Sequence, residues 1–190
     1  MKWKPSVVFG IAMMTSAFVM SGCSIRSDGG ETSAAQKLSD SFTVEMTMVI
    51  DDLQGTGTVT RYGEAAWRVQ FAEPSSLAGV VLDFSGTDVS ASYQGLAFSV
   101  PQTAIPAKSV LLNLIFVVDA LAQQEKIVGE ADGDQVRVEG EREGNPYVLT
   151  LTQEGELAGF EMDNMDTVLT FTQFQSGAVA VATETTVVAS

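Results

Sequence analysis

One uninterrupted apolar segment constrains the fold of this chain more than any other feature. Residues 107–124 contain neither glycine nor proline, and apolar residues occupy positions on almost every side of the helix that this segment would form. Eighteen helical residues span about 27 Å. Because a helix that is apolar nearly all round must be covered by other parts of the protein, the sequence predicts a helix at 107–124 that is buried on both sides.

The segments before and after this helix alternate between apolar and polar residues, which is the period of a half-buried strand. In the first of them, Thr43, Glu45 and Thr47 separate five apolar residues, with Val49 as the exception: Phe42, Val44, Met46, Met48 and Ile50. We expect Gly55-Thr56-Gly57 to belong to a turn that leads into a strand ending near Tyr62. Strands are further predicted around Trp67, up to Pro74, and at 77–84, 88–93, 96–100, 126–130, 135–139, 147–152, 156–162 and 167–174.

Short strands at hairpin spacing, with no helix between them, indicate an antiparallel meander. A large twisted sheet must curl or be covered, and the helix at 107–124 is its natural cover. The predicted fold class is therefore mainly β with one long helix (α+β), a large curved antiparallel sheet forming a half-open barrel around an apolar helix.

The N-terminus has the pattern of an export signal. Lys2 and Lys4 precede an uncharged apolar run at 7–20, which is shorter than the roughly 20 residues of a membrane-spanning helix. The run ends in Val19-Met20-Ser21-Gly22-Cys23, which resembles the lipobox of bacterial lipoproteins. Cys23 is the only cysteine of the chain. We therefore expect a signal peptide at 1–22 and a diacylated Cys23, with an ordinary secretory signal as the alternative.

These expectations divide the chain into a signal peptide, a lipidated cysteine with a flexible spacer (23–38), one domain (39–175) and a poorly ordered tail (176–190). The predicted location is the extracytoplasmic face of the cell membrane, or the outer membrane if the host has one. The helix at 107–124 could itself span a membrane. Asn113 and Asp119 within the run argue against this alternative, and the lipid anchor makes a spanning helix redundant.

Composition excludes several function classes. The chain has no histidine, and the anchor consumes its one thiol, so catalytic triads and His or Cys metal sites are absent. After removal of the signal peptide, 8 basic residues remain against 24 acidic ones, a net charge of −16 that repels nucleic-acid phosphates. We expect no enzyme activity, no cofactor, no metal and no nucleic-acid partner.

Two stretches resemble the lipoprotein carrier-like superfamily, the LolA-type proteins, whose membrane-anchored relatives include germination lipoproteins. The first is residues 67–74, read WRVQFAEP, followed by Leu77-Ala78-Gly79-Val80. The second is Gly155-Glu156-Leu157, followed by Leu169-Thr170-Phe171. The resemblance covers roughly residues 39–174. It implies a half-barrel whose concave apolar face, capped by helices, holds acyl chains or docks a protein.

The candidate binding residues are the apolar side chains that strands and helix would direct into this half-barrel. Methionine adapts to irregular apolar ligands, although ordinary core packing is the alternative interpretation. The full set is Met46, Met48, Trp67, Phe84, Leu111, Ile115 and Val118. Two functions stay open: a tethered protein that binds lipid, acyl chains or lipoprotein cargo, and a non-catalytic module that docks a cell-envelope protein at the membrane surface.

Overall fold

The computed structural model describes residues 23–24, 34–86, 88–99 and 106–177, and one antiparallel sheet dominates them. Two α-helices accompany the sheet: α1 (Ala34–Ser39) and α2 (Pro106–Ala122). The strands before α2 are β1 (Cys23–Ser24), β2 (Phe42–Ile50), β3 (Leu53–Gly63), β4 (Ala66–Glu73), β5 (Val80–Ser85), β6 (Asp88–Tyr93) and β7 (Leu96–Ser99). Those after it are β8 (Val128–Asp132), β9 (Gln135–Arg142), β10 (Asn145–Thr152), β11 (Leu157–Met162) and β12 (Thr167–Ser176), with a short 3₁₀ turn, η1 (Asp163–Met165), before the last.

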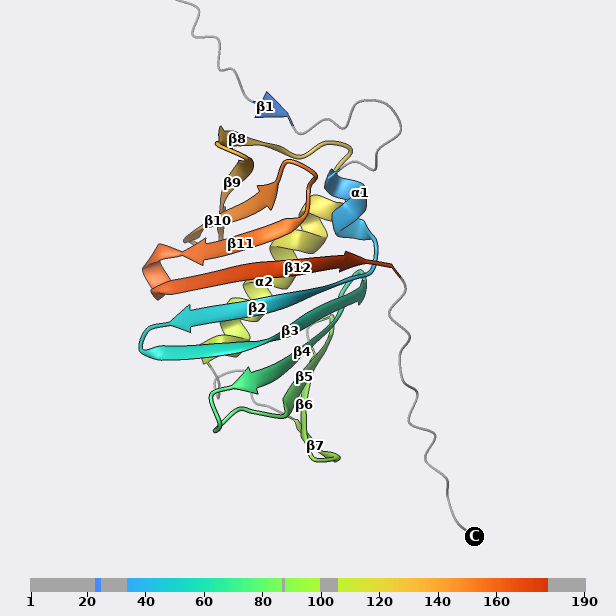
Figure 1. Cartoon of the computed structure of the whole chain (residues 1–190), viewed down its shortest axis with the longest axis vertical. Coiled ribbons are helices and arrows are strands. Elements are labelled where there is room, and N and C mark those ends of the chain that lie inside the picture. The colour runs from blue at the N-terminus through green and yellow to red at the C-terminus, as the bar shows by residue number, and fades with distance from the viewer. Residues whose placement is uncertain (1–22, 25–33, 87, 100–105, 178–190) are drawn as a thin grey trace, which may run out of the picture.

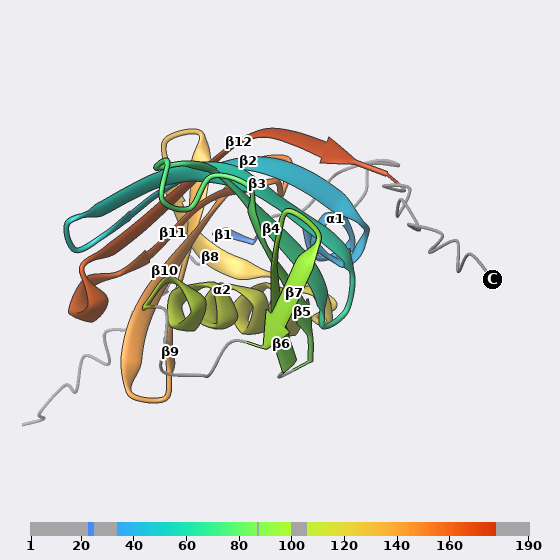
Figure 2. The same ribbon diagram turned by 90° about the horizontal axis from the view of Figure 1, so that it is seen from below.

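The order of the strands explains the position of the long helix. The sheet runs β1-β8-β9-β10-β11-β12-β2-β3-β4-β5-β6-β7, so β12 pairs with β2 in its middle, and β7 and β8 lie toward opposite ends. Because α2 connects β7 to β8, it must cross the whole sheet. It does so inside the hollow of the curved sheet (Figures 1 and 2). The predicted fold class is confirmed.

The register of the strands aligns apolar side chains into rows across this hollow. One row crosses the half of the sheet that follows α2 and continues into β2: Val138, Leu149, Phe160, Leu169 and Met48. A second row crosses the half that precedes α2: Val44, Val59, Val69, Leu82 and Ala91. All of these side chains are buried, so period-two alternation in the sequence becomes one continuous apolar concave face.

The predicted helix is confirmed with slightly different ends, Pro106–Ala122 instead of 107–124. The predicted burial on both sides is wrong, because Ala120 is exposed and Leu112 and Phe116 are only half-buried. Within the described residues, neither helix has the length and apolar character that crossing a bilayer requires. The predicted turns at Asp132-Gly133, Glu143-Gly144 and Glu154-Gly155 are confirmed, with the three glycines at φ of 63°, 80° and 82°. The predicted signal peptide and most of the predicted tail lie outside the described residues.

The predicted turn at Gly55-Thr56-Gly57 is wrong, because both glycines belong to β3. They pair with Met48 and Met46 of β2. A Cβ at Gly55 would lie 2.8 Å from the Glu73 carbonyl oxygen and 2.9 Å from the Met48 methyl carbon, and one at Gly57 would lie 2.4 Å from the Gln70 carbonyl oxygen. Glycine is therefore required here inside a strand, where a side chain and a neighbouring backbone approach closely.

Candidate functional site: the interface of helix and sheet

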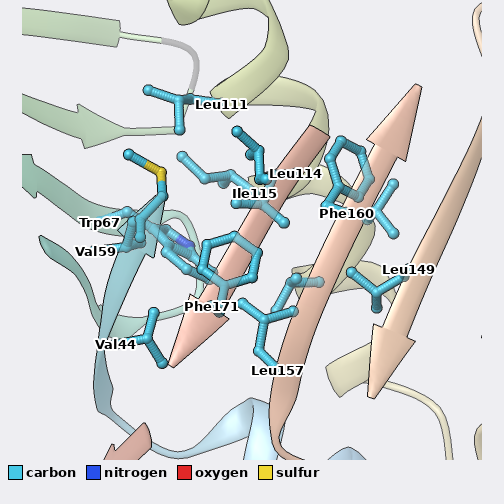
Figure 3. Close-up of a cluster of buried hydrophobic side chains, with 14 of the residues drawn as sticks. Val44, Val59, Trp67, Leu111, Leu114, Ile115, Leu149, Leu157, Phe160 and Phe171 are labelled. Carbon is cyan, nitrogen blue, oxygen red and sulfur yellow. The ribbon is translucent and has the colours of Figure 1, made fainter. Parts of the chain in front are cut away.

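The structure brings the seven predicted binding residues into one cluster between α2 and the concave face. Strand β2 supplies Met46 and Met48, strands β4 and β5 supply Trp67 and Phe84, and α2 supplies Leu111, Ile115 and Val118. Each of the seven is at most 3% exposed. Figure 3 shows Trp67, Leu111 and Ile115 within this apolar cluster.

The inner face of α2 follows the spacing of a helix that packs on one side. Its apolar residues are Val110, Leu111, Leu114, Ile115, Val117, Val118 and Leu121, all buried. In Figure 3, Leu114 and Ile115 lie between Phe160 of β11 and Trp67 of β4. The helix thus contacts strands from both halves of the sheet and holds them around one core.

Side chains fill the space between α2 and the sheet at these positions. A side chain that lines an open cavity retains accessible surface inside the cavity, whereas Met48 and Val118 are 0% exposed and Met46, Trp67 and Leu111 are 1% exposed. In this state the seven residues pack as a core. An acyl chain can reach them only if α2 moves away from the sheet.

A buried polar cluster fastens the carboxyl-terminal half of α2. The Asp119 carboxylate accepts hydrogen bonds from Arg61 Nε at 3.0 Å, from the Ala65 backbone N–H at 2.8 Å and from the Trp67 indole Nε1 at 3.2 Å. Arg61 Nη2 lies 3.0 Å from the same carboxylate. Both charged residues are buried, so their mutual contact replaces the hydration that each has lost.

The same arginine also joins α1 to the cluster. Arg61 Nη1 donates to the carbonyl oxygen of Ser39, the last residue of α1, and to that of Asp40 at 3.3 Å. A cation suits the carboxyl end of a helix, where backbone carbonyls lack partners. The cluster therefore connects α1, the β3–β4 hairpin and α2 through one guanidinium group.

This polar cluster was not predicted from the sequence, in which Asp119 stood only as an interruption of an apolar run and Arg61 was not singled out. The sequence does contain a signal for this cluster: Arg61 lies two residues after the buried Val59 in the same strand, so its side chain lies on the same, inward face. A charged side chain on the inward face of a strand requires a buried partner. Asp119, the only acidic residue in 107–124, was the natural candidate.

A second polar contact lies over the amino-terminal half of α2. Arg142, at the end of β9, donates from Nε to Asn113 Oδ1 at 3.2 Å, and its guanidinium carbon lies 3.9 Å from the centre of the Phe116 ring. Asn113 also donates to Met162 Sδ at 3.6 Å. This contact is partly exposed, and it holds the β9–β10 hairpin against the outer side of the helix.

Two ionisable groups near these elements have shifted pKa values. Partial burial raises the pKa of the Tyr147 phenol, whose ring stacks on Phe160 with centres 5.9 Å apart. The hydrogen bond to Asp83 raises the pKa of Arg68, against the smaller opposing effect of its partial burial. Neither group belongs to a constellation that could hold a metal ion, and the described residues contain no group of three metal-binding side chains.

Two pockets among the described residues open at the surface of the sheet and not between α2 and the concave face. A pocket of about 420 Å³ opens beside the β2–β3 turn and reaches Met48, Gly55 and Pro74. A pocket of about 290 Å³ lies among β9, β10 and β11, beside Arg137, Tyr147 and Glu161. Polar and apolar groups contribute comparably to both linings. Neither pocket unites the seven predicted residues.

No family model and no curated protein matches this chain. Solved structures similar to it include a LolA superfamily protein from Nitrosomonas europaea, with 14% identity over 77% of this chain and 91% of that one (TM-score 0.35). Another is a proposed outer membrane lipoprotein-sorting protein domain from Vibrio parahaemolyticus, with 10% identity over 78% and 90% (TM-score 0.42). An uncharacterized conserved protein from Thermus thermophilus has 14% identity over 77% and 84% (TM-score 0.45).

Proposed function

We propose that this chain is an extracytoplasmic lipoprotein, tethered through a diacylated Cys23, whose half-barrel binds acyl chains or lipoprotein cargo in exchange for α2. The observation that carries the proposal is that one helix occupies an otherwise continuous apolar concave face. Exchange requires α2 to leave this face.

The energies of the two occupants are comparable. Burial of an acyl chain of about 16 carbons gains on the order of 12 kcal/mol, at about 0.8 kcal/mol per methylene. The seven inner apolar side chains of α2 gain about 1.5–3 kcal/mol each. Exchange would also break the contacts of Asp119 with Arg61, Ala65 and Trp67. The buried cluster is therefore the element that would hold the resting state closed.

The experiment compares uptake of a fluorescent fatty acid by the chain from Ser24 onward with uptake by its Asp119→Asn variant. The amide keeps the size of the side chain and weakens its contact with Arg61, so we expect saturable uptake that increases in the variant. Lipid extracted from the purified protein and analysed by mass spectrometry should contain acyl chains. Clean extracts together with no uptake by either protein would count against the proposal.

The tether is tested separately. In a bacterial host that lipidates its exported proteins, the mature N-terminal peptide should carry the mass of a diacylglyceryl group. Incorporation of labelled palmitate should disappear in a Cys23→Ser variant. A mature chain that begins elsewhere, or that carries no lipid, would contradict this part of the proposal and leave the binding experiment unaffected.

A packed interior favours a second candidate, a non-catalytic module that docks a cell-envelope protein. The β6–β7 turn offers Tyr93 and Leu96, which are 41% and 73% exposed. Crosslinking in intact cells should recover one dominant protein, and a Leu96→Asp variant should lose it. Recovery of the same proteins with both chains would argue against this candidate.

A further inference from the structure

The first two residues of the predicted mature chain belong to the sheet. Cys23 pairs with Gly129 and Ser24 pairs with Val128, in antiparallel register along β8. Strand β1 is thereby the end of the sheet, next to β8. If Cys23 carries the lipid, as proposed above, the anchor leaves the protein directly from this edge.

The two ends of the sheet are then at different distances from the bilayer. Neighbouring strands lie about 4.8 Å apart, so 12 strands extend on the order of 50 Å along the curved sheet. Figure 1 shows β1 and β7 at opposite ends of the domain. An anchor in β1 brings β8 to the membrane surface and leaves the β6–β7 turn far from it.

The side chains along the β8 edge restrict the kind of lipid surface that it can approach. Val128 is 58% exposed, so an apolar side chain lies beside the anchor. Glu130 and Asp132 of the same strand are exposed and acidic, and Arg137 compensates only in part through its contact with Asp132 at 3.9 Å. Anionic head groups would be repelled by these carboxylates, whereas zwitterionic ones would not.

We propose that the β1–β8 edge is the membrane-facing surface of this protein and lies against zwitterionic lipid head groups, with Val128 at the interface. The β6–β7 turn points away from the bilayer. This inference rests on the proposed lipidation of Cys23 and adds the orientation of the domain relative to the membrane. The edge of the sheet holds the described part of the chain close to the lipid surface.

The chain offers a matched pair of positions for the test. Once Cys23 is lipidated, the protein has no free thiol, so Val128→Cys and Leu96→Cys each introduce one labelling site. Both native side chains are apolar and well exposed, at opposite ends of one sheet. The full-length lipoprotein carries an environment-sensitive fluorophore at either site and is placed in phosphatidylcholine nanodiscs that contain a spin-labelled lipid.

We expect loss of fluorescence by quenching at position 128 and none above the solution background at position 96. Partial replacement of phosphatidylcholine by phosphatidylglycerol should reduce the quenching at 128. Equal quenching at both positions, or stronger quenching at 96, would overturn the proposed orientation. The mass of the N-terminal peptide is measured on the same samples, so a failure of lipidation is distinguished from a different orientation of a lipidated protein.

Discussion

The two halves of α2 are held by polar contacts that differ in charge and in exposure to water. Near the carboxyl end, Asp119 meets Arg61 inside the core. Near the amino end, Arg142 meets Asn113 and Phe116 where water has access. Each contact joins an arginine of a strand to a residue of the helix. The two contacts therefore differ in burial and in the charge of the helix residue, which is a carboxylate in Asp119 and a neutral amide in Asn113.

The loss of stability on removal of a contact depends mainly on how deeply the contact is buried. Removal of one member of a buried ion pair leaves the other charge without water and without a partner, which costs about 3–5 kcal/mol. The half-buried Arg142 regains water when its contacts on the helix are removed, so these contacts contribute only about 0.5–1.5 kcal/mol. We therefore expect α2 to be fixed mainly at its carboxyl-terminal half.

The largest effect is expected for Asp119→Ala. This change leaves the buried Arg61 guanidinium uncompensated and removes acceptors from Ala65 N–H and the Trp67 indole, so the free energy of unfolding should fall by about 3–5 kcal/mol. Urea titration followed by the fluorescence of Trp67, the only tryptophan after the predicted signal peptide, measures the loss.

Two variants control for the Asp119→Ala result. Asp119→Asn keeps an acceptor and the side-chain volume, so it should lose less stability than the alanine variant. An Arg61→Met, Asp119→Leu double variant removes both charges and should be less destabilised than Asp119→Ala alone, because no charge remains unpaired. A loss below about 1 kcal/mol for Asp119→Ala would mean that burial does not distinguish the two halves of the helix.

The sequence predicts the parts of this picture that depend on local pattern. Alternation of apolar and polar residues identified the buried face of β2, and an unbroken apolar run identified α2. Burial of one face gives a strand a period of two residues and a helix a period of 3.6 residues. The cluster of Met46, Trp67 and Ile115 follows from those two patterns once the sheet curves around the helix.

Long-range pairing is less accessible from the sequence. Arg61 and Asp119 are 58 positions apart, and their contact depends on how the β3–β4 hairpin is placed against α2, which periodicity does not specify. The role of Gly55 was misjudged for a similar reason, since the backbone carbonyl oxygen of Glu73 on another strand creates the requirement. Whether helix and sheet enclose space or fill it is a matter of volume, which no residue pattern records.

A smaller effect is expected for Arg142→Ala. This variant loses one hydrogen bond to Asn113 and a cation–π contact with Phe116, together worth about 0.5–1.5 kcal/mol at a partly exposed position. Urea titration under the same conditions gives the direct comparison with Asp119→Ala. A lysine at this position keeps the charge and loses the planar group, so Arg142→Lys tests whether stacking contributes. A loss as large as that of Asp119→Ala would invalidate the comparison.

The ion pair of Arg68 and Asp83 connects two neighbouring strands and does not involve α2. It therefore serves as the reference for an exposed ion pair. Its nitrogen and oxygen lie 2.7 Å apart, closer than the 3.0 Å of Arg61 and Asp119, yet both side chains are more than a third exposed. We expect Arg68→Ala to lower the free energy of unfolding by about 0–1 kcal/mol, and by less at high salt. A loss above that of Arg142→Ala would mean that distance, and not burial, ranks these contacts.

The smallest effect is confined to alkaline pH and concerns the hairpin that carries Arg142. Burial raises the pKa of the Tyr147 phenol above its ordinary value of 10.0, so the folded state favours the neutral ring. This contribution to stability is complete below pH 10 and is lost as the pH rises through the pKa of the folded state. Urea titrations of the natural chain and Tyr147→Phe should therefore differ by a constant amount below pH 10, with the natural chain losing stability relative to the variant above it. If the stabilities of the two proteins change in parallel above pH 10, the Tyr147 ring is as hydrated in the folded state as in the unfolded chain. The ring would then pack less tightly on Phe160 than the structure indicates.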